Sequence, residues 1–290
     1  MCVFKTHGYK GTEIYAFYSS YDYLSIQLYL WLLTGSFNVE LLFALKSCSL
    51  FIFITTNKFV MRKTTILCLT LICSLQYYSS AQDSYDKHPN TSGAGWTDLF
   101  NRDLGNAIFE KGVWTVSDGV ITASKDEALW SEKAYDNFIL DLEFKNADST
   151  NSGVIVHASD IKDWIPHSVE IQIADDYSEK WSKVVPSWQC AAIFGHQAAT
   201  KRTVKKAGEW NHYTITCVDK KIWVVLNGEL VNVCDMSLFT SAKTNPDGTE
   251  IPSWLSNPMA SLPLHGYIGF QGKHAGAPIY FRNIKIKELK

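Results

Sequence analysis

Short runs of alternating apolar and polar residues, separated by turn signals, constrain the fold of this chain more than any other feature of its sequence. Such runs are typical of strands buried on one face, and pairs of them flank Asp118-Gly119 and Asn227-Gly228. These dipeptides favour tight turns between antiparallel strands. Because the sequence shows no helical periodicity longer than two turns and no internal repeat, it predicts an all-β sandwich or jelly roll.

Two details refine this prediction. The last run, Ile279 to Ile286, alternates until Arg282-Asn283, where its apolar positions change face, as they do at a β-bulge. Two long segments, residues 160–196 and 237–264, interrupt the strands and are rich in Trp or Pro. Loops of such length in a compact β domain are usually functional. Their aromatic rings could lie flat against sugar rings or could cap the ends of the sandwich.

One run carries candidate site residues on its wet face. In the sequence VEIQIADD, the apolar residues of Val169–Ile173 share one face, while Glu170 and Gln172 share the other and Asp175 follows the strand. A carboxylate, an amide and a second carboxylate can together bind hydroxyl groups. The alternative is an ordinary solvated sheet face.

The N-terminal part of the chain does not resemble the rest. Met61-Arg62-Lys63, the apolar stretch Thr64–Leu75 and Ser79-Ser80-Ala81 have the pattern of a secretory signal peptide over residues 61–81. We interpret residues 1–60 as upstream translation from a misassigned start codon. Residues 41–60 could instead be a membrane anchor, but two lysines interrupt them, so we expect no integral anchor. Residues 82–94 are polar and predict a flexible leader, and residues 95–290 predict a single domain exported to the periplasm or cell surface.

Composition narrows the possible partners. Without residues 1–81 the chain has 21 Lys and Arg against 26 Asp and Glu, a net charge of −5. Nucleic-acid binding calls for a basic surface, so we expect no nucleic-acid partner. Three cysteines remain, Cys190, Cys217 and Cys234. An odd number without C-x-x-C spacing argues against a disulfide framework or a zinc site, and we expect buried free thiols.

Eight motifs appear in the order found in the 3-keto-disaccharide hydrolase family, which this chain resembles from about Gly95 to Leu289. They are Gly95-Trp96 with Leu99-Phe100-Asn101, Trp114 with Asp118-Gly119, Asn151-Ser152-Gly153, Glu170-Ile171-Gln172-Ile173 with Asp175, Gly208-Glu209-Trp210-Asn211, Asn227-Gly228, Gly269-Phe270-Gln271 with His274, and Phe281-Arg282-Asn283-Ile284. The resemblance implies a concanavalin A-like jelly-roll sandwich of two antiparallel sheets. It also implies cleavage of oligosaccharides or other glycosides already oxidised to a ketone at C3 of the sugar.

This chemistry defines the groups to look for. A C3 ketone acidifies the C2 proton, so a base removes it, the aglycone leaves C1 by elimination, and water adds back. The site needs a base near C2 and a donor or cation near the enolate oxygen. Our candidates for catalysis are Glu170, His196, His274 and His157, the last standing where the family often has arginine. Our candidates for substrate binding are Gln172, Asp175, Trp181, Trp188, Gln271 and Arg282.

Two other functions fit the same residues. Jelly-roll β-glucanases carry Glu-x-Asp-x-x-Glu on one strand, and Glu170, Gln172 and Asp175 have that spacing, although the central carboxylate is an amide here. A carbohydrate-binding module without catalysis would use the same aromatic loops and polar face. The sequence establishes no cofactor, but an oxygen-rich cluster of Glu, Gln and Asp side chains suits a hard divalent cation such as calcium.

Overall fold

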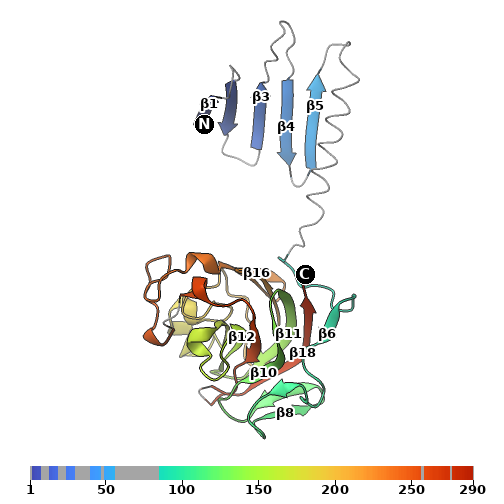
Figure 1. Cartoon of the computed structure of the whole chain (residues 1–290), viewed down its shortest axis with the longest axis vertical. Helices are drawn as coiled ribbons and strands as arrows, with labels where there is room; N and C mark the ends of the chain where they lie inside the picture. The colour runs from blue at the N-terminus through green and yellow to red at the C-terminus, as the bar shows by residue number, and fades with distance from the viewer. Residues whose placement is uncertain are drawn as a thin grey trace. The chain divides into compact units, whose positions relative to one another are not determined.

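The structure is a computed structural model that describes residues 85–255, 258–274 and 276–289, together with the backbone of five strands within residues 2–55. The chain divides into two compact units, residues 1–83 and 84–290 (Figure 1). In the first unit, β1 (Cys2–His7) pairs with β2 (Glu13–Tyr18), and β3 (Leu24–Tyr29), β4 (Glu40–Lys46) and β5 (Ser49–Thr55) form a second antiparallel sheet.

Several expectations for the N-terminal part remain predictions. The expected signal peptide, residues 61–81, lies outside the described residues. The interpretation of residues 1–60 as upstream translation is also untested. Within the part of the chain that the structure describes, no helix is both long enough and apolar enough to cross a membrane.

The second unit is a jelly-roll sandwich of two antiparallel sheets, as predicted. The five-stranded sheet has the order β13-β12-β17-β10-β7. Its strands are β7 (Ala107–Ile108), β10 (Leu129–Tyr135), β12 (Asn151–Ala158), β13 (Val169–Ala174) and β17 (Gly266–Phe270). The other sheet has eight strands, in the order β16-β15-β14-β11-β18-β9-β8, with β6 also paired to β18. They are β6 (Trp96–Asp98), β8 (Trp114–Ser117), β9 (Val120–Ala123), β11 (Phe138–Asn146), β14 (Trp210–Val218), β15 (Lys221–Leu226), β16 (Glu229–Asp235) and β18 (Ile279–Glu288).

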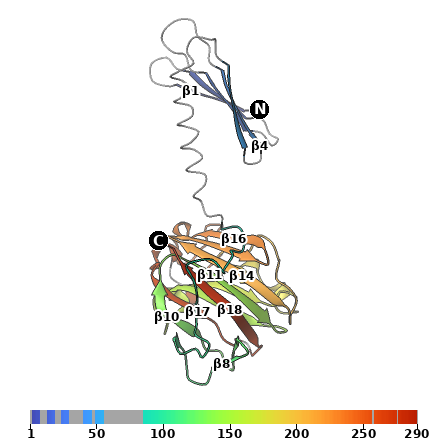
Figure 2. The same cartoon turned by 90° about the vertical axis from the view of Figure 1, so that its right-hand side faces the viewer.

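The remaining ordered segments are short. Helical structure among the described residues consists of three-residue 3-10 turns: η1 (Ile165–His167), η2 (Trp181–Lys183), η3 (Pro186–Trp188), η4 (Met236–Leu238), η5 (Ser253–Leu255) and η6 (Met259–Ser261). Strands β14, β11 and β18 run side by side across the unit (Figure 2). The long segments of residues 160–196 and 237–264, drawn in yellow and orange, lie on the side of β12 rather than β18 (Figure 1).

The local signals of the sequence correspond to observed turns and bulges. Asp118-Gly119 and Asn227-Gly228 have positive φ at both positions, the conformation of the tight turns that join β8 to β9 and β15 to β16. The pairing of β11 with β18 shifts register beside Arg282, and Asn283 has φ of +53°, which confirms the predicted bulge. The three cysteines are buried and free, also as predicted.

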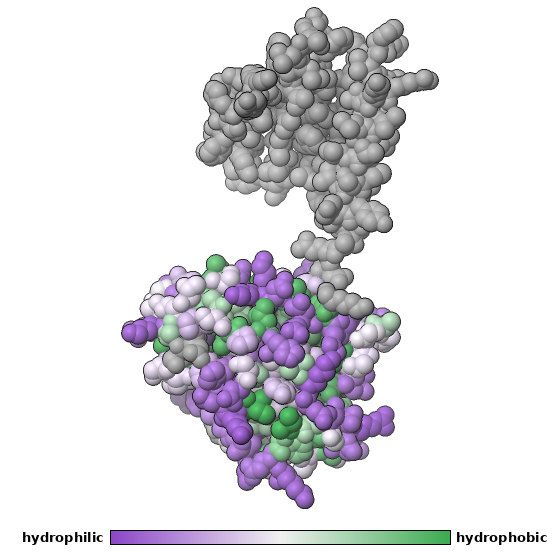
Figure 3. Space-filling model, viewed as in Figure 1, coloured by the Kyte–Doolittle hydropathy of each residue, from purple (hydrophilic) through white to green (hydrophobic). Residues whose placement is uncertain are grey.

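The apolar faces of the two sheets meet in one core. Phe270 of β17 and Phe281 of β18 pack edge to face across the sandwich with ring centroids 5.0 Å apart. Tyr213 of β14 is completely buried and donates its hydroxyl hydrogen to the carbonyl oxygen of Gln172 in β13 at 2.8 Å. The outer surface seen in Figure 3 is mainly hydrophilic with smaller apolar patches. The core therefore ties β13, the strand of interest, directly to the opposite sheet.

The outward face of the five-stranded sheet is also tightly packed at one point. Trp130 of β10 lies across Gly269 of β17, so that a Cβ atom added to Gly269 would be 2.4 Å from Cζ3 of the indole. Trp130 in turn packs edge to face against Trp164, 6.1 Å away. Glycine at this position is required by the neighbouring ring.

We predict that Gly269→Ala lowers the free energy of unfolding by about 1–3 kcal/mol, the usual effect of forcing an extra methyl group into a packed contact. Urea denaturation of the variant and the wild type measures the difference. Gly93→Ala is the control, because a Cβ there meets nothing closer than 3.6 Å. Equal midpoints for Gly269→Ala and the wild type would contradict the prediction.

Candidate functional site

A cavity of about 360 Å³ opens on the outward face of the five-stranded sheet. Its walls come from the ends of β12, β13 and β17 and from the two long loops. The described lining residues are Asn151, Trp164, Ile165, Glu170, Gln172, Lys180, Trp181, Val184, Trp188, Phe194, Trp254, Gln271 and His274. Six of the predicted site residues, Glu170, Gln172, Trp181, Trp188, Gln271 and His274, are therefore brought together.

The floor of the cavity follows from the alternation of β13. Ile171 and Ile173 are fully buried in the core, so Glu170 and Gln172 face the opposite way, into the cavity. The loop segment around Ile193 completes the edge of the sheet, because Phe194 N donates to the carbonyl oxygen of Glu170 and Gln172 N donates to that of Ala192. The strand is hydrogen-bonded on both sides, which fixes the position of its two polar side chains.

The carboxyl group of Glu170 occupies space that Gly153 leaves free. Gly153 lies opposite Gln172 on the neighbouring strand β12. A Cβ atom at Gly153 would lie 2.1 Å from Oε1 of Glu170 and 2.6 Å from its Cγ. Any larger residue at this position would push the Glu170 side chain aside. The glycine of Asn151-Ser152-Gly153 thus has a positional role at the site.

Glu170 is held in its uncharged form over much of the pH range. Its carboxyl group forms no hydrogen bond or ion pair with another described residue. Burial in the cavity, together with the negative charge of Asp126, raises the pKa of Glu170 to about 8. Burial is the larger cause, since a charged carboxylate loses its hydration there without a partner to replace it. At neutral pH the site therefore holds a protonated carboxyl group.

Two side-chain amides present unused acceptors. Gln172 donates from Nε2 to Oδ1 of Asn151 at 3.1 Å and to the carbonyl oxygen of Trp188 at 3.2 Å. Its Oε1 is buried without a partner among the described residues, and so is Oε1 of Gln271. Buried polar atoms are normally satisfied. Two such atoms beside one cavity are suited to accept hydrogen bonds from the hydroxyl groups of a ligand.

His274 has the arrangement of a base. Its backbone bridges to Asn151 at the start of β12, and its Nδ1 lies 2.6 Å from Oδ2 of Asp126. Nδ1 therefore carries the hydrogen and donates it to the carboxylate, which leaves Nε2 with its lone pair in neutral imidazole. Gly272 lets the chain before His274 pass close to the turn that contains Asp126, because a Cβ atom there would lie 2.5 Å from the carbonyl oxygens of Lys125 and Glu127.

The four other predicted site residues lie outside the cavity, and two of them are histidines in structural contacts. His157 is completely buried at a bulge of β12, where its Nδ1 contacts the carbonyl oxygen of Leu264 at 2.6 Å. His196 is held by Oδ1 of Asn245 at 3.0 Å and packs against Phe239. Burial lowers the pKa of both imidazoles. Both residues connect loops to the sandwich, so we leave them out of the proposed machinery.

The other two, Asp175 and Arg282, make contacts that stabilise the sandwich. Asp175 is buried and accepts the backbone N–H of Ser149 at 3.0 Å, which fixes the turn before β12. Arg282 lies on the eight-stranded sheet, bonded to Glu143 at 2.9 Å and placed over the ring of Trp210. Because Asp175 faces away from Glu170 and Gln172, the β-glucanase-like set of residues does not converge.

The sequence did not single out several residues that line or support the cavity. Asn151 belongs to a quoted motif, but its contact with Gln172 was not anticipated. Trp164 and Trp254 were visible only as aromatic residues in the two long loops, and Phe194 and Lys180 were not singled out. Asp126 lies between strands in a charged turn, where nothing in the local sequence pairs it with His274. Long-range contacts of this kind cannot be detected from the sequence alone.

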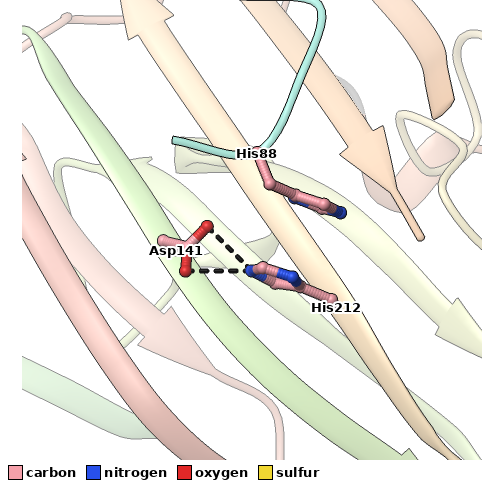
Figure 4. A group of neighbouring side chains, drawn as sticks. All are labelled: His88, Asp141 and His212. Atoms are coloured by element: carbon pink, nitrogen blue, oxygen red, sulfur yellow. Dashed lines mark hydrogen bonds and ion pairs between the residues drawn. The ribbon is translucent and has the colours of Figure 1, made fainter. Parts of the chain in front are cut away.

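A second polar cluster lies on the eight-stranded sheet, where His88, Asp141 and His212 place possible metal ligands within 4.8 Å of one another. The two imidazole rings are stacked, with centroids 3.6 Å apart, and Asp141 faces the edge of His212 (Figure 4). His212 donates from Nε2 to Asp141 at 2.9 Å. His88 belongs to the segment for which the sequence predicted a flexible leader.

The hydrogen bonds of His88 account for both of its ring nitrogens. Nε2 accepts the N–H of Gly228 at 2.8 Å, so Nδ1 carries the hydrogen and donates it to the hydroxyl of Thr214, which donates to Asp141. A metal ion on His88 would displace one of these bonds. We therefore describe this cluster as a clamp that attaches the segment around His88 to the sheet. Burial and the neighbouring His212 lower the pKa of His88 to about 4.

From residue 95 onward the chain is similar to known proteins. A family model described as "3-keto-alpha-glucoside-1,2-lyase-like domain" matches residues 95–287. A protein of Parabacteroides distasonis ATCC 8503, named "putative glycosyl hydrolase", is 53% identical over 67% of this chain and 99% of its own, with a TM-score of 0.66. A second protein of that organism and name is 24% identical over 71% of this chain and 100% of its own, with a TM-score of 0.58, and shares the fold. A search of curated proteins found no match.

We predict that Glu170→Gln makes the protein more stable than the wild type at pH 8 and that the advantage shrinks toward pH 5. In the wild type the folded state keeps a proton that the unfolded state releases above its ordinary pKa of 4.5, so stability falls as pH rises from there to about 8. The difference changes by at most about 1.4 kcal/mol per pH unit. Denaturation at pH 5, 6.5 and 8 measures it, with the exposed Glu132→Gln as control. A pH-independent difference would refute the prediction.

We also predict that the clamp opens in acid. The attached form of His88 resists a proton that the detached form accepts below its ordinary pKa of 6.5, so attachment is complete above that pH and weakens as pH falls toward 4. Hydrogen exchange of the Gly228 amide, corrected for the intrinsic rate, should lose protection between pH 7 and 5. His88→Gln, which keeps hydrogen-bonding groups but does not titrate, should show no such loss. Unchanged protection in the wild type would rule the clamp out.

Proposed function

The chain belongs to the family of 3-keto-alpha-glucoside-1,2-lyase-like domains, and from this membership we propose that it cleaves glycosides that carry a ketone at C3 of the sugar. A carbohydrate-active function follows from the family itself. We further propose that the protein acts outside the cytoplasm, in the periplasm or at the cell surface. This second proposal depends on the signal-peptide pattern of residues 61–81.

The proposed reaction is an elimination followed by hydration. A base takes the C2 proton, and the electrons of the C2–H bond form an enolate with the C3 carbonyl group. The enolate then expels the aglycone, so that the C1–O bond breaks and the leaving oxygen receives a proton from an acid. Water adds across the resulting C1–C2 double bond to give the free 3-keto sugar. The protein must supply a base, an acid and hydrogen bonds that orient the sugar.

The observation that carries the proposal is the carboxyl group of Glu170, which lines the cavity without a hydrogen-bond or ion-pair partner among the described residues. An acid with a pKa of about 8 keeps its proton at neutral pH and can give it to a leaving oxygen. His274 supplies the complementary group, because Asp126 holds the hydrogen on Nδ1 and leaves Nε2 able to accept the C2 proton. We therefore assign the acid to Glu170 and the base to His274.

The unused amide oxygens support recognition of a sugar. Oε1 of Gln172 and Oε1 of Gln271 are acceptors, which suits the donating hydroxyl groups of a ring bound against the sheet. The same amide oxygens are hard donors of the kind that calcium prefers. A divalent cation at this place would stabilise the enolate, and we propose it as the alternative to stabilisation by hydrogen bonds alone.

A binding module without catalysis is the second candidate. The observation that favours it is the cluster of Trp188, Phe194 and Trp254 beside the polar floor, since aromatic rings next to hydrogen-bonding groups also serve sugar binding. The two candidates differ in chemistry. A module would bind glycosides unchanged, and loss of Glu170 as an acid would matter little to it.

We predict that the wild type releases the aglycone from 3-keto-glucosides and forms a 2-hydroxy-3-keto-glycal that mass spectrometry detects. Glu170→Gln should lower kcat by about 10²-fold or more, because the amide has no proton to give. The wild-type rate should fall as pH rises through about 8, where Glu170 loses its proton. His274→Gln should be similarly impaired, whereas its control His265→Gln, from the exposed His265–Asp136 pair, should not.

Two outcomes would change this assignment. A protein that binds glycosides but releases no aglycone from any 3-keto-glycoside would support the binding module. Sensitivity of the wild type to EDTA, reversed by calcium, would assign enolate stabilisation to a cation. The assay is therefore run with and without EDTA.

A further inference from the structure

The lining of the cavity divides sharply into two chemical halves. Five of the six described polar lining residues come from the strands of the sheet or directly follow them: Asn151, Glu170, Gln172, Gln271 and His274. All the apolar ones come from the loops: Trp164, Ile165, Trp181, Val184, Trp188, Phe194 and Trp254. A ligand in this cavity would have one polar end against the sheet and one apolar end against the loops.

The apolar half contains a cluster of three aromatic rings, built from both long loops and inclined to one another by 31° to 64°. Ring centroids are 5.4 Å apart for Trp188 and Phe194, 5.7 Å for Phe194 and Trp254, and 6.3 Å for Trp188 and Trp254. Trp254 is 46% exposed and Ile165 is 39% exposed, both at the cavity. We call Trp188, Phe194 and Trp254 the aromatic wall. Large exposed apolar groups beside a cavity mark a binding surface more often than a packing defect.

The aromatic wall suits an aromatic ring better than a second sugar. Lys180 is the one polar lining residue from the described loops, and its ammonium group lies over the ring of Trp181, 4.6 Å from the centroid. The carbonyl oxygen of Trp188 already accepts from Gln172. Apart from the indole N–H groups, the wall has no side-chain hydrogen-bonding group, so hydroxyl groups placed against its ring faces would lose water with little in return. An aromatic ring would bury apolar surface there and would pack against the indoles.

We propose that the leaving group of the natural substrate is an aromatic aglycone, so that the protein is selective for aryl 3-keto-glucosides over 3-keto-disaccharides. This inference rests on the proposed function for its chemistry, but its structural basis is the aromatic wall alone. The sugar would occupy the polar half beside Glu170 and His274. The aglycone would extend from C1 onto Trp254 and its neighbours.

The test compares two substrates of the same anomeric configuration, a 2-naphthyl 3-keto-glucoside and a 3-keto-disaccharide, in the wild type and Trp254→Ala. The two aglycones differ in intrinsic leaving ability, but this difference cancels when the ratio of their kcat/KM values is compared between proteins. We expect the ratio to fall about fivefold to tenfold in Trp254→Ala, the effect of losing an aromatic contact. Trp254→Phe should keep most of it, and Trp223→Ala, on the opposite sheet, should leave it unchanged.

A binding measurement separates failure of this inference from failure of the proposed function. Calorimetry with the unoxidised 2-naphthyl glucoside and the unoxidised disaccharide needs no catalysis. Preference for the aryl compound that Trp254→Ala removes supports the inference even if no substrate is cleaved, in which case the proposed function alone is wrong. Equal losses for both ligands, or a preference for the disaccharide, would overturn it and identify the aromatic wall as a platform for sugar rings.

Discussion

The close approach of Glu170 to Gly153 is the constraint on which the candidate site depends. A carboxyl group can lie flat over the neighbouring strand only where that strand has no side chain, and a Cβ atom at Gly153 would be 2.1 Å from Oε1. This placement takes away part of the hydration of the carboxyl group and gives it no partner in exchange, which raises its pKa to about 8. One missing side chain thus determines both where the acid lies and in which protonation state.

The rest of the sandwich keeps this arrangement in place. Tyr213 crosses the core to bond the carbonyl oxygen of Gln172, and the segment around Ile193 pairs with the outer edge of β13. The strand is therefore restrained from the opposite sheet and from both sides within its own layer. A rigid strand is needed because it carries two unfavourable groups, the unpaired carboxyl group of Glu170 and the amide oxygen of Gln172, which has no partner among the described residues. The stability that the core supplies offsets the cost of these unfavourable groups at the site.

The sequence correctly predicted those features of the fold that depend on a few neighbouring residues. Alternation and turn chemistry identified the strands, the two tight turns and the bulge at Arg282-Asn283, because each depends on a few neighbouring residues. Alternation also placed Glu170 and Gln172 on the outward face, and the family motifs added Gln271 and His274. The same reasoning selected His157 and His196, whose residue type suggested catalysis. Their burial against Leu264 and Asn245 is set by loops distant in sequence, which no local pattern reports.

Asp126, the partner of His274, is a site residue that no local pattern in the sequence could identify. Asp126 is separated from His274 by 148 positions and lies in a turn whose charge looks like ordinary surface. The functional property of the pair, an imidazole with a defined tautomer, exists only after β10 and β17 have paired and brought the turn before one strand beside the loop after the other. The acid and the base of this site therefore arise differently. Glu170 is positioned by the alternation of one strand and a glycine next to it, whereas His274 is positioned by topology. Substitutions that weaken the pairing of β10 with β17 should impair the base before they affect the acid.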